Sequence, residues 1–127
     1  MDVPEDLRYS SDHEWVRREG TRMVVGITDY AQDALGDVVY VEVPGTGTAV
    51  AAGERVSEVE STKSVSDIFA PVGGTVVDAN ASLGDRPELL NSDPYGDGWI
   101  LVIEVGDDGG GWDALMDAAA YRSLTDE

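Results

Sequence analysis

The sequence contains no cysteine and only one histidine, one phenylalanine and one lysine among 127 residues. Without cysteine the polypeptide has no disulfide, thiolate nucleophile or thiolate ligand. A Ser-His-Asp triad would need His13, the sole histidine, and no motif around it supports nucleophilic catalysis. The acidic residues lack the spacing of an EF-hand loop, and the glycine-rich stretch lacks the lysine of a phosphate-binding loop. We therefore expect neither catalytic residues nor a metal site.

Basic residues are also scarce, with 8 lysines and arginines against 26 acidic residues, a net charge of -18 and a pI near 4.1. This balance argues against nucleic-acid and membrane partners, which are recognised through basic patches. The sequence has no basic N-terminal region followed by an apolar stretch, so it predicts neither a signal peptide nor a membrane span. In molar salt, where the Debye length is about 3 Å, dense carboxylates repel one another less. The composition is halophile-like and indicates a cytoplasmic protein of a salt-adapted organism.

Short apolar runs separated by Gly, Pro, Asn and Asp predict a mainly β protein. Their number and tight spacing are typical of a small sandwich or barrel. A chain of this length is expected to make one domain over residues 1–127, with its core at about 9–105. The expected strands cover residues 14–18, 23–27, 37–43, 49–51, 56–61, 65–69, 75–79 and 99–105.

Three helical segments are predicted. Residues 29–36 begin with an acid, continue with a Gln three residues later and end in Gly, which is the pattern of a short capped helix near 29–35. A helical turn is expected near 87–90. Residues 106–111 (GDDGGG) read as a flexible linker, after which Asp113 is expected to cap a C-terminal helix over about 113–122.

The single lysine, Lys63, lies between two strand-like runs near the middle of the chain. Residues 44–50 (PGTGTAV) are echoed by residues 71–77 (PVGGTVV), so a weak repeat flanks it on both sides. Two strand pairs related by a local twofold would place Lys63 in an exposed turn, although Gly-rich turns can also resemble one another by chance. Acidic adaptation alone explains why lysines are scarce, but it does not explain why the single lysine lies at this position. A lone primary amine on an exposed turn is a natural attachment point for a covalent cofactor.

The segment around Lys63, residues 59–74 (VESTKSVSDIFAPVGG), resembles the lipoyl-attachment segment of the glycine cleavage system H protein family. The likeness covers about residues 9 to 105, and its blocks follow the family's order. The other similar blocks are residues 13–16 (HEWV), 25–32 (VGITDYAQ), 35–39 (LGDVV) and 87–99 (PELLNSDPYGDGW).

This resemblance implies a lipoyl-domain-like barrel-sandwich hybrid of two packed antiparallel sheets, with a C-terminal helix outside. It also implies that Lys63 carries lipoate in amide linkage, as N6-lipoyllysine, and that the protein is a carrier and not an enzyme. The implied partners are the glycine decarboxylase (P-protein), the aminomethyltransferase (T-protein), the dihydrolipoamide dehydrogenase (L-protein), and a lipoate ligase or lipoyl/octanoyl transferase. Between them the carrier, a monomer when free, would move the aminomethyl group of glycine in one-carbon metabolism.

Family members are thought to hold the loaded arm in a surface cleft. The residues that match family cleft positions include Glu14 and Asp67, whose carboxylates would bind the amine as an ammonium ion. Ala34 stands where many relatives carry a histidine, which leaves that contact without its usual side chain. The alternative for Glu14 and Asp67 is that they are two ordinary solvated carboxylates in an acidic chain.

Two other functions stay open at the level of sequence. One is a lipoyl or biotinyl carrier or relay domain for another acyl-transfer complex. Biotin acceptors usually flank their lysine with methionines, whereas Thr62 and Ser64 flank it here, and the HEW and DPYGDGW blocks are foreign to biotinyl domains. The other is an interaction module that carries nothing, in which Lys63 is merely left over from acidic adaptation.

Overall fold

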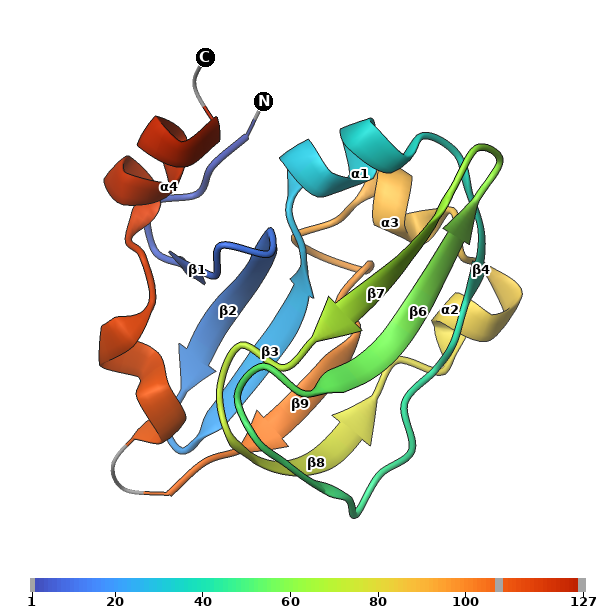
Figure 1. The fold of residues 1–127 in the computed structure, drawn as a ribbon. Coiled ribbons are helices and arrows are strands. Elements are labelled where there is room, and N and C mark those ends of the chain that lie inside the picture. Colours follow the sequence, from blue (N-terminus) through green and yellow to red (C-terminus); the bar gives the residue numbers. More distant parts are fainter. Residues whose placement is uncertain (1, 107–108, 126–127) are drawn as a thin grey trace.

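The computed structural model describes residues 2–106 and 109–125, in which two antiparallel β-sheets pack face to face and short helices close the ends (Figure 1). The larger sheet has the strand order β1-β2-β3-β9-β8-β5, and the smaller sheet has the order β4-β6-β7. The strands are β1 (Arg8–Tyr9), β2 (Glu14–Glu19), β3 (Arg22–Ile27), β4 (Val38–Val41), β5 (Ala49–Val50), β6 (Arg55–Ser61), β7 (Val65–Phe69), β8 (Gly74–Ala79) and β9 (Leu101–Glu104). The helices are α1 (Asp29–Leu35), α2 (Ser82–Asp85), α3 (Leu89–Ser92), the 3-10 helix η1 (Gly109–Ala114) and α4 (Ala118–Thr125).

Apolar side chains between the two sheets form the main core. Val25 of β3 and Ile103 of β9 belong to it from the large sheet, while Val59 of β6 belongs to it from the small sheet. A second cluster lies on the outer face of the large sheet, where Trp15 and Tyr121 are fully buried. Burial of apolar surface is the dominant favourable term in folding, so these two layers fix the strands on which the functional residues lie.

The predicted sandwich and helix α1 are confirmed. All strand pairs are antiparallel, and α1 occupies residues 29–35 as expected. The capping residue is Thr28 and not Asp29, because the Thr28 hydroxyl accepts a hydrogen bond from the Ala31 amide at 3.1 Å. Gly36 ends the helix at φ 81°, a left-handed conformation that glycine adopts readily.

The C-terminal helix begins five residues later than predicted. Met116 forms a β-bridge with Tyr9, with N–H···O distances of 2.8 and 2.9 Å, so the chain is extended where a helix was expected. The helix can therefore start only after this bridge, and Asp117 caps it by accepting a hydrogen bond from the Ala120 amide at 2.9 Å. The linker predicted over 106–111 is wrong for 109–111, which begin helix η1, while residues 107–108 lie outside the described residues.

The two copies of the sequence repeat lie side by side. Strand β5 of the first copy pairs with strand β8 of the second, with Ala49 opposite Thr75. The hairpin that joins β6 to β7 lies in the chain between the copies and carries Lys63 at its turn, as the repeat predicted. No helix among the described residues is long and apolar enough to span a membrane.

Candidate functional site

Lys63 is exposed at the turn of the β6–β7 hairpin, and Ser61 orders this turn. The Ser61 amide donates to the Ser64 carbonyl at 2.8 Å, and the Ser61 hydroxyl accepts from the amides of Lys63 and Ser64 at 3.3 and 3.1 Å. The Thr62 amide donates to the Asp37 carbonyl at 3.0 Å, which ties the turn to the residue before β4. The backbone that presents the amine is thus held at both sides, while the side chain projects from it.

The Lys63 side chain lies along the end of helix α1. A Cβ atom built on Gly36 would lie 3.2 Å from Lys63 Cε and 3.8 Å from Nζ, so glycine leaves room for the lysine stem. Within residues 2–106 and 109–125, Lys63 takes part in none of the ion pairs. The amine is therefore accessible and is not committed to a carboxylate.

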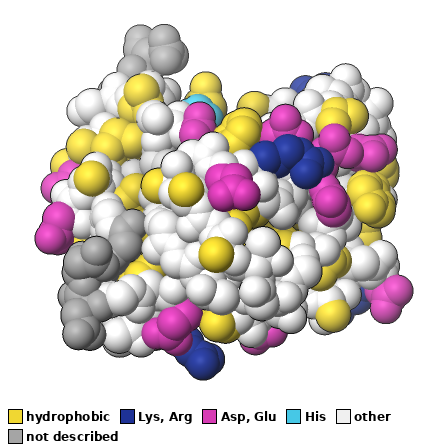
Figure 2. Space-filling model, turned by 60° about the horizontal axis from the view of Figure 1, so that its bottom comes forward, with side chains coloured by type: hydrophobic (Ala, Val, Ile, Leu, Met, Phe, Trp, Pro, Cys, Tyr) yellow, Lys and Arg dark blue, Asp and Glu magenta, His cyan; other side chains and the backbone are white. Residues whose placement is uncertain are grey.

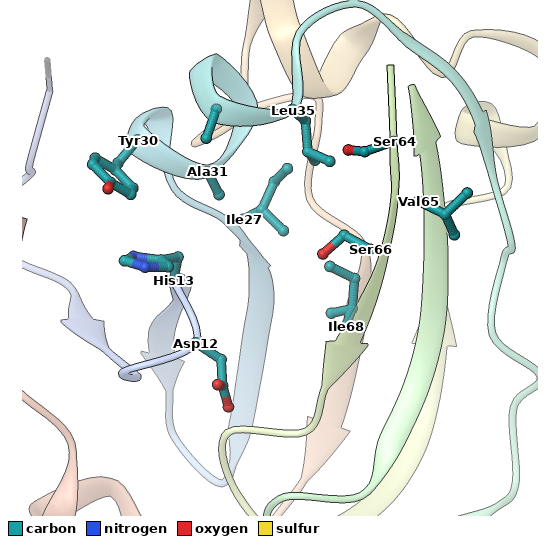
Figure 3. Close-up of a pocket in the computed structure, with 11 residues that line it drawn as sticks. Asp12, His13, Ile27, Tyr30, Ala31, Leu35, Ser64, Val65, Ser66 and Ile68 are labelled. Carbon is teal, nitrogen blue, oxygen red and sulfur yellow. The ribbon is translucent and has the colours of Figure 1, made fainter. Parts of the chain in front are cut away.

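A cleft of about 270 Å³ opens beside this hairpin, between helix α1 and strand β7 (Figure 3). Ile27 and Ile68 form part of its wall, and Ala34 adds only a methyl group. Val65 and Ser66 also line the cleft, and Figure 3 shows Ser66 pointing toward it, whereas the outer part of the Val65 side chain leans away from it. The cleft is thus a mainly apolar hollow with a few polar groups at its edges, next to the exposed amine. The other lining residues are Asp12, His13, Tyr30, Ala31, Leu35 and Ser64.

His13 forms the wall of the cleft that faces Tyr30, and the C-terminal helix holds it in place. Its Nδ1 atom lies 2.8 Å from the Tyr121 hydroxyl, which lies 2.7 Å from the Thr28 hydroxyl. The Tyr30 ring packs against the imidazole with ring centroids 4.7 Å apart. Burial lowers the pKa of His13, although the charge of Asp12 opposes this, so the imidazole is neutral at neutral pH. Sequence reasoning missed this role, because the contact with Tyr121 joins residues 108 positions apart.

Glu14 joins the two sheets. Strand β7 is an edge strand of the small sheet, and its Phe69 amide donates to Glu14 Oε2 of the large sheet at 3.1 Å. The Ser10 hydroxyl donates to Glu14 Oε1 at 2.6 Å. The side chain is 1% exposed, and burial raises its pKa to about 7, while the hydrogen bonds from Ser10 and Phe69 partly offset this rise. The carboxyl group therefore changes charge near neutral pH.

The raised pKa of Glu14 predicts a specific dependence of stability on pH. The folded protein holds this proton up to about pH 7, whereas the unfolded chain releases it near 4.5, so its stabilising contribution is lost as pH rises between these values. We expect the unfolding free energy of the wild type, relative to Glu14→Gln, to fall by about 2–3 kcal/mol from pH 4.5 to 8. Urea unfolding of both proteins at constant salt measures this difference.

An exposed carboxylate provides the control for that experiment. Asp33 lies exposed on helix α1, and Asp33→Asn removes one negative charge without touching the junction of the sheets. Its pH profile relative to the wild type measures what the loss of one exposed carboxylate alone changes over the same pH range. Parallel pH profiles for the wild type and Glu14→Gln would show that Glu14 titrates alike in the folded and unfolded states.

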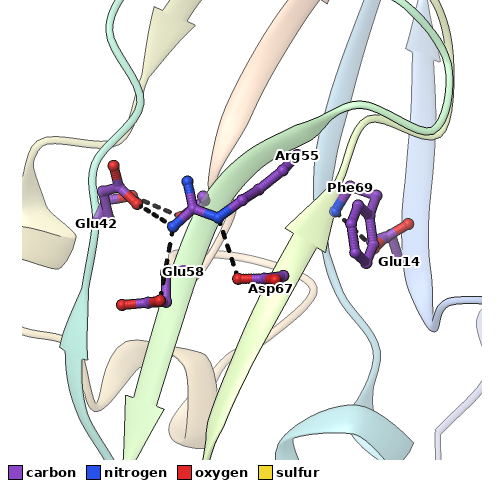
Figure 4. A network of polar contacts seen from close by, with 7 residues as sticks. Glu14, Glu42, Arg55, Glu58, Asp67 and Phe69 are labelled. Atoms are coloured by element: carbon purple, nitrogen blue, oxygen red, sulfur yellow. Dashed lines mark hydrogen bonds and ion pairs between the residues drawn. The ribbon is translucent and has the colours of Figure 1, made fainter.

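Asp67 lies on the outer face of the small sheet, in a cluster of charges around Arg55 (Figure 4). Its Oδ1 atom is 3.1 Å from Arg55 Nε, while Arg55 Nη2 lies 2.8 Å from Glu42 and 3.7 Å from Glu58. These side chains are between one third and one half exposed, so each pair contributes little to stability. One guanidinium faces three carboxylates, which leaves the cluster net negative.

The structure places the predicted site residues in three surroundings. Lys63 adjoins the cleft, Glu14 lies buried next to it with both oxygens hydrogen-bonded, and Asp67 faces outward toward Arg55. Neither carboxylate belongs to the lining of the cleft. In the part of the chain that the structure describes, no group of three or more His, Cys, Asp or Glu residues could hold a metal ion.

Comparisons with known proteins agree with this geometry. The family model described as glycine cleavage H-protein matches residues 7–127. A glycine cleavage system H protein from Anaeromyxobacter sp. (strain K) is 54% identical over 127 residues, covering 100% of this chain and 98% of the relative. A probable glycine cleavage system H protein from Haloarcula marismortui is 58% identical over 122 residues, covering 96% of this chain and 95% of the relative.

The fold is also similar to a solved structure. The crystal structure of a glycine cleavage system H protein from Mycobacterium marinum superposes with a TM-score of 0.85 at 39% sequence identity. The match covers 97% of this chain and 98% of that one. Both the sequence and the arrangement of the two sheets are therefore shared along nearly the whole chain.

Proposed function

The chain belongs to the glycine cleavage H-protein family, and on that basis we propose that Lys63 is the residue on which it carries lipoate. The protein is a lipoyl carrier and not a catalyst. The single observation that supports Lys63 is its geometry. It is the only lysine in the chain, and it is exposed at an ordered hairpin turn beside a cleft.

The residues around Lys63 fit a long covalent arm. The amine has no carboxylate partner within residues 2–106 and 109–125, and Gly36 lets the stem lie flat against the end of α1. Thr62 and Ser64, which flank it, are small and exposed, so an acylating enzyme can reach Nζ. When bound, lipoate supplies a dithiolane that accepts the aminomethyl group of glycine and is afterwards reoxidised.

The chain itself contributes position and shelter. Because the hairpin is anchored through Ser61 and Asp37, the tether swings from a fixed point and its end is kept at a high local concentration near any docked partner. We propose that the neighbouring cleft receives the end of the arm. Its apolar wall of Ile27 and Ile68 suits hydrocarbon, and its neutral His13 does not repel a bound amine.

Glu14 and Asp67 remain predicted contacts of that amine. Both carboxylates already have partners, so an incoming ammonium would compete with Arg55 for Asp67 and with the Phe69 amide for Glu14. Glu14 is also protonated in part near neutral pH, which weakens it as an anion. Of the two, Asp67 is more accessible, and its ion pair is easier to exchange.

The chain interacts with the other components of the glycine cleavage system. We propose that the specific partners are the glycine decarboxylase, the aminomethyltransferase and the dihydrolipoamide dehydrogenase, with a lipoate ligase or transferase for loading. We further propose that the free carrier is a monomer, because a net charge of -18 disfavours association with a second copy.

A reconstituted reaction tests this function. The lipoylated chain is combined with the three enzymes, glycine, tetrahydrofolate and NAD⁺, and NADH formation is followed. We expect glycine-dependent NADH with the lipoylated chain and none with the same chain before lipoylation. A lipoylated chain that is inactive with glycine but supports a 2-oxoacid dehydrogenase would instead favour the relay function.

A further inference from the structure

The outer face of the small sheet carries exposed apolar side chains close to Lys63. Four large hydrophobic side chains are exposed among the described residues, and three of them lie on this face: Val39 at 54%, Tyr40 at 48% and Val65 at 59%. Single exposed apolar residues are ordinary on protein surfaces, but a group beside a functional residue is informative. We call these three residues the hairpin patch.

A β-bulge produces this patch. The pairing of β4 with β6 shifts register between Val38 and Tyr40, so an extra residue is inserted in β4. Regular alternation would turn one of two consecutive residues inward, whereas here Val39 and Tyr40 are both exposed between the buried Val38 and Val41. The bulge thus turns two adjacent hydrophobic side chains outward at a cost in regular pairing. Bulges that re-aim side chains in this way are over-represented next to functional sites.

The register of the sheet joins the patch to the lysine hairpin. Tyr40 lies opposite Glu60, and Glu60 lies opposite Val65, so the three side chains form one row on the same face. Val65 is two residues from Lys63, and the bond from the Thr62 amide to the Asp37 carbonyl holds the turn against the start of β4. The patch is therefore fixed relative to the amine.

Acidic side chains surround the patch. Glu60 lies within the row, and the next row carries Glu42, Glu58 and Asp67 around Arg55 (Figure 4). Acidic side chains are also scattered over the face shown in Figure 2. A second copy of this chain would bring the same negative charge against this rim, which disfavours self-association. The complementary partner has an apolar contact surface with basic residues around it.

We infer that the hairpin patch docks the enzyme that acylates Lys63, an inference that rests on the proposed function. Before acylation the amine is at the end of a four-carbon stem that lies along Gly36, so the acylating active site must approach the hairpin closely. Enzymes that act on the loaded arm reach it over a longer tether and can dock farther away. The patch and its acidic rim adjoin the turn that the acylating enzyme must cover.

Kinetics with a lipoate ligase test this inference. The variants Tyr40→Ser and Val65→Ser are compared with Leu124→Ser, which removes the fourth exposed hydrophobic side chain, from helix α4. We expect the KM for the carrier to rise about tenfold in Tyr40→Ser and Val65→Ser with kcat nearly unchanged, and to stay constant in Leu124→Ser. Equal KM values in all four proteins would overturn the inference. Circular dichroism and urea unfolding confirm that the variants are folded.

A binding measurement separates this inference from the proposed function. The affinity of the ligase for the non-acylatable Lys63→Arg chain is measured with and without Tyr40→Ser, and should fall about tenfold with it. If the wild type is acylated but Tyr40→Ser does not change the affinity for the ligase, the inference is wrong, while the carrier function still holds. If the ligase binds the chain through the patch but does not acylate the wild type, Lys63 is not the attachment site, while the patch is still a docking surface for the ligase. A dimer of the free chain that Tyr40→Ser abolishes, with no change in ligase affinity, assigns the patch to self-association and overturns the inference.

Discussion

Replacing Lys63 with arginine is expected to reduce glycine-dependent NADH formation to the level measured without the carrier. A guanidinium stays protonated at physiological pH and cannot be acylated in place of the amine. The same substitution should change the unfolding free energy by less than about 0.5 kcal/mol, because the side chain is exposed and makes no ion pair with the described residues. Activity would thus vanish without loss of the fold.

A charge-matched variant controls for the amine itself. Arg86 is exposed after helix α2, and Lys63→Arg combined with Arg86→Lys keeps one lysine and the net charge of -18. We expect this double variant to be as inactive as the single one, since its amine is no longer on the β6–β7 turn. Lipoylation and activity recovered through residue 86 would show that the position of the lysine is not what the modifying enzyme recognises.

Replacing Trp15 with alanine is expected to have the largest effect on stability, a loss of about 3–5 kcal/mol. The indole is fully buried on the outer face of the large sheet, and its Nε1 donates to the Pro94 carbonyl at 2.8 Å. Gly26 of the neighbouring strand is packed against the ring so closely that a Cβ there would lie 2.7 Å from it. Truncation to alanine leaves a cavity that the rigid backbone cannot close, and it leaves the Pro94 carbonyl without its hydrogen-bond donor. The loss is a large share of the roughly 5–15 kcal/mol typical of a domain.

Urea unfolding of Trp15→Ala and Trp112→Ala under one salt concentration measures this effect. Trp112 of helix η1 is only partly buried where it packs against the main core, and the guanidinium groups of Arg8 and Arg18 lie 5.1 and 5.9 Å from its ring centroid. Its loss should cost about 1 kcal/mol. If Trp112→Ala destabilised the protein as much as Trp15→Ala, burial of the Trp15 indole would not be the main contribution to stability from the outer face of the large sheet.

The local parts of the fold were predictable from the sequence because their signals are local. Alternating apolar residues bounded by turn formers predicted the hairpin of β6 and β7, and the terminal Gly36 predicted the end of helix α1. The exposed position of Lys63 followed from the flanking repeat, whose two copies pair as β5 and β8. Each of these inferences needed only the period of a strand or the chemistry of a turn.

Features that depend on distant contacts were not predictable in this way. The start of helix α4 is set by the bridge between Met116 and Tyr9, and nothing near residue 113 signals it. Glu14 is one of 26 acidic residues, and only the edge of β7 in the folded chain distinguishes it as buried and hydrogen-bonded. The bulge that exposes Val39 and Tyr40 likewise arises from the register between two strands.

The cleft was likewise predictable from the sequence only in part. Its position beside Lys63 follows from the hairpin, but its lining does not follow from the motif that predicted Glu14 and Asp67. His13 enters the wall because Tyr121 of the C-terminal helix holds its ring. Side chains that meet through tertiary packing thus shape the shelter for the arm, while the attachment point itself is visible in the sequence.

Mass spectrometry after incubation with lipoate, ATP and a lipoate ligase tests the central claim most directly. The intact mass reports how many lipoyl groups are attached, and fragmentation of the peptide that spans β6 and β7 locates them. We predict one lipoyl group per chain, on Nζ of Lys63, and none on the Lys63→Arg variant. A chain that stays unmodified, or one modified only at its N-terminal amine, would contradict the assignment of Lys63 as the lipoyl carrier residue.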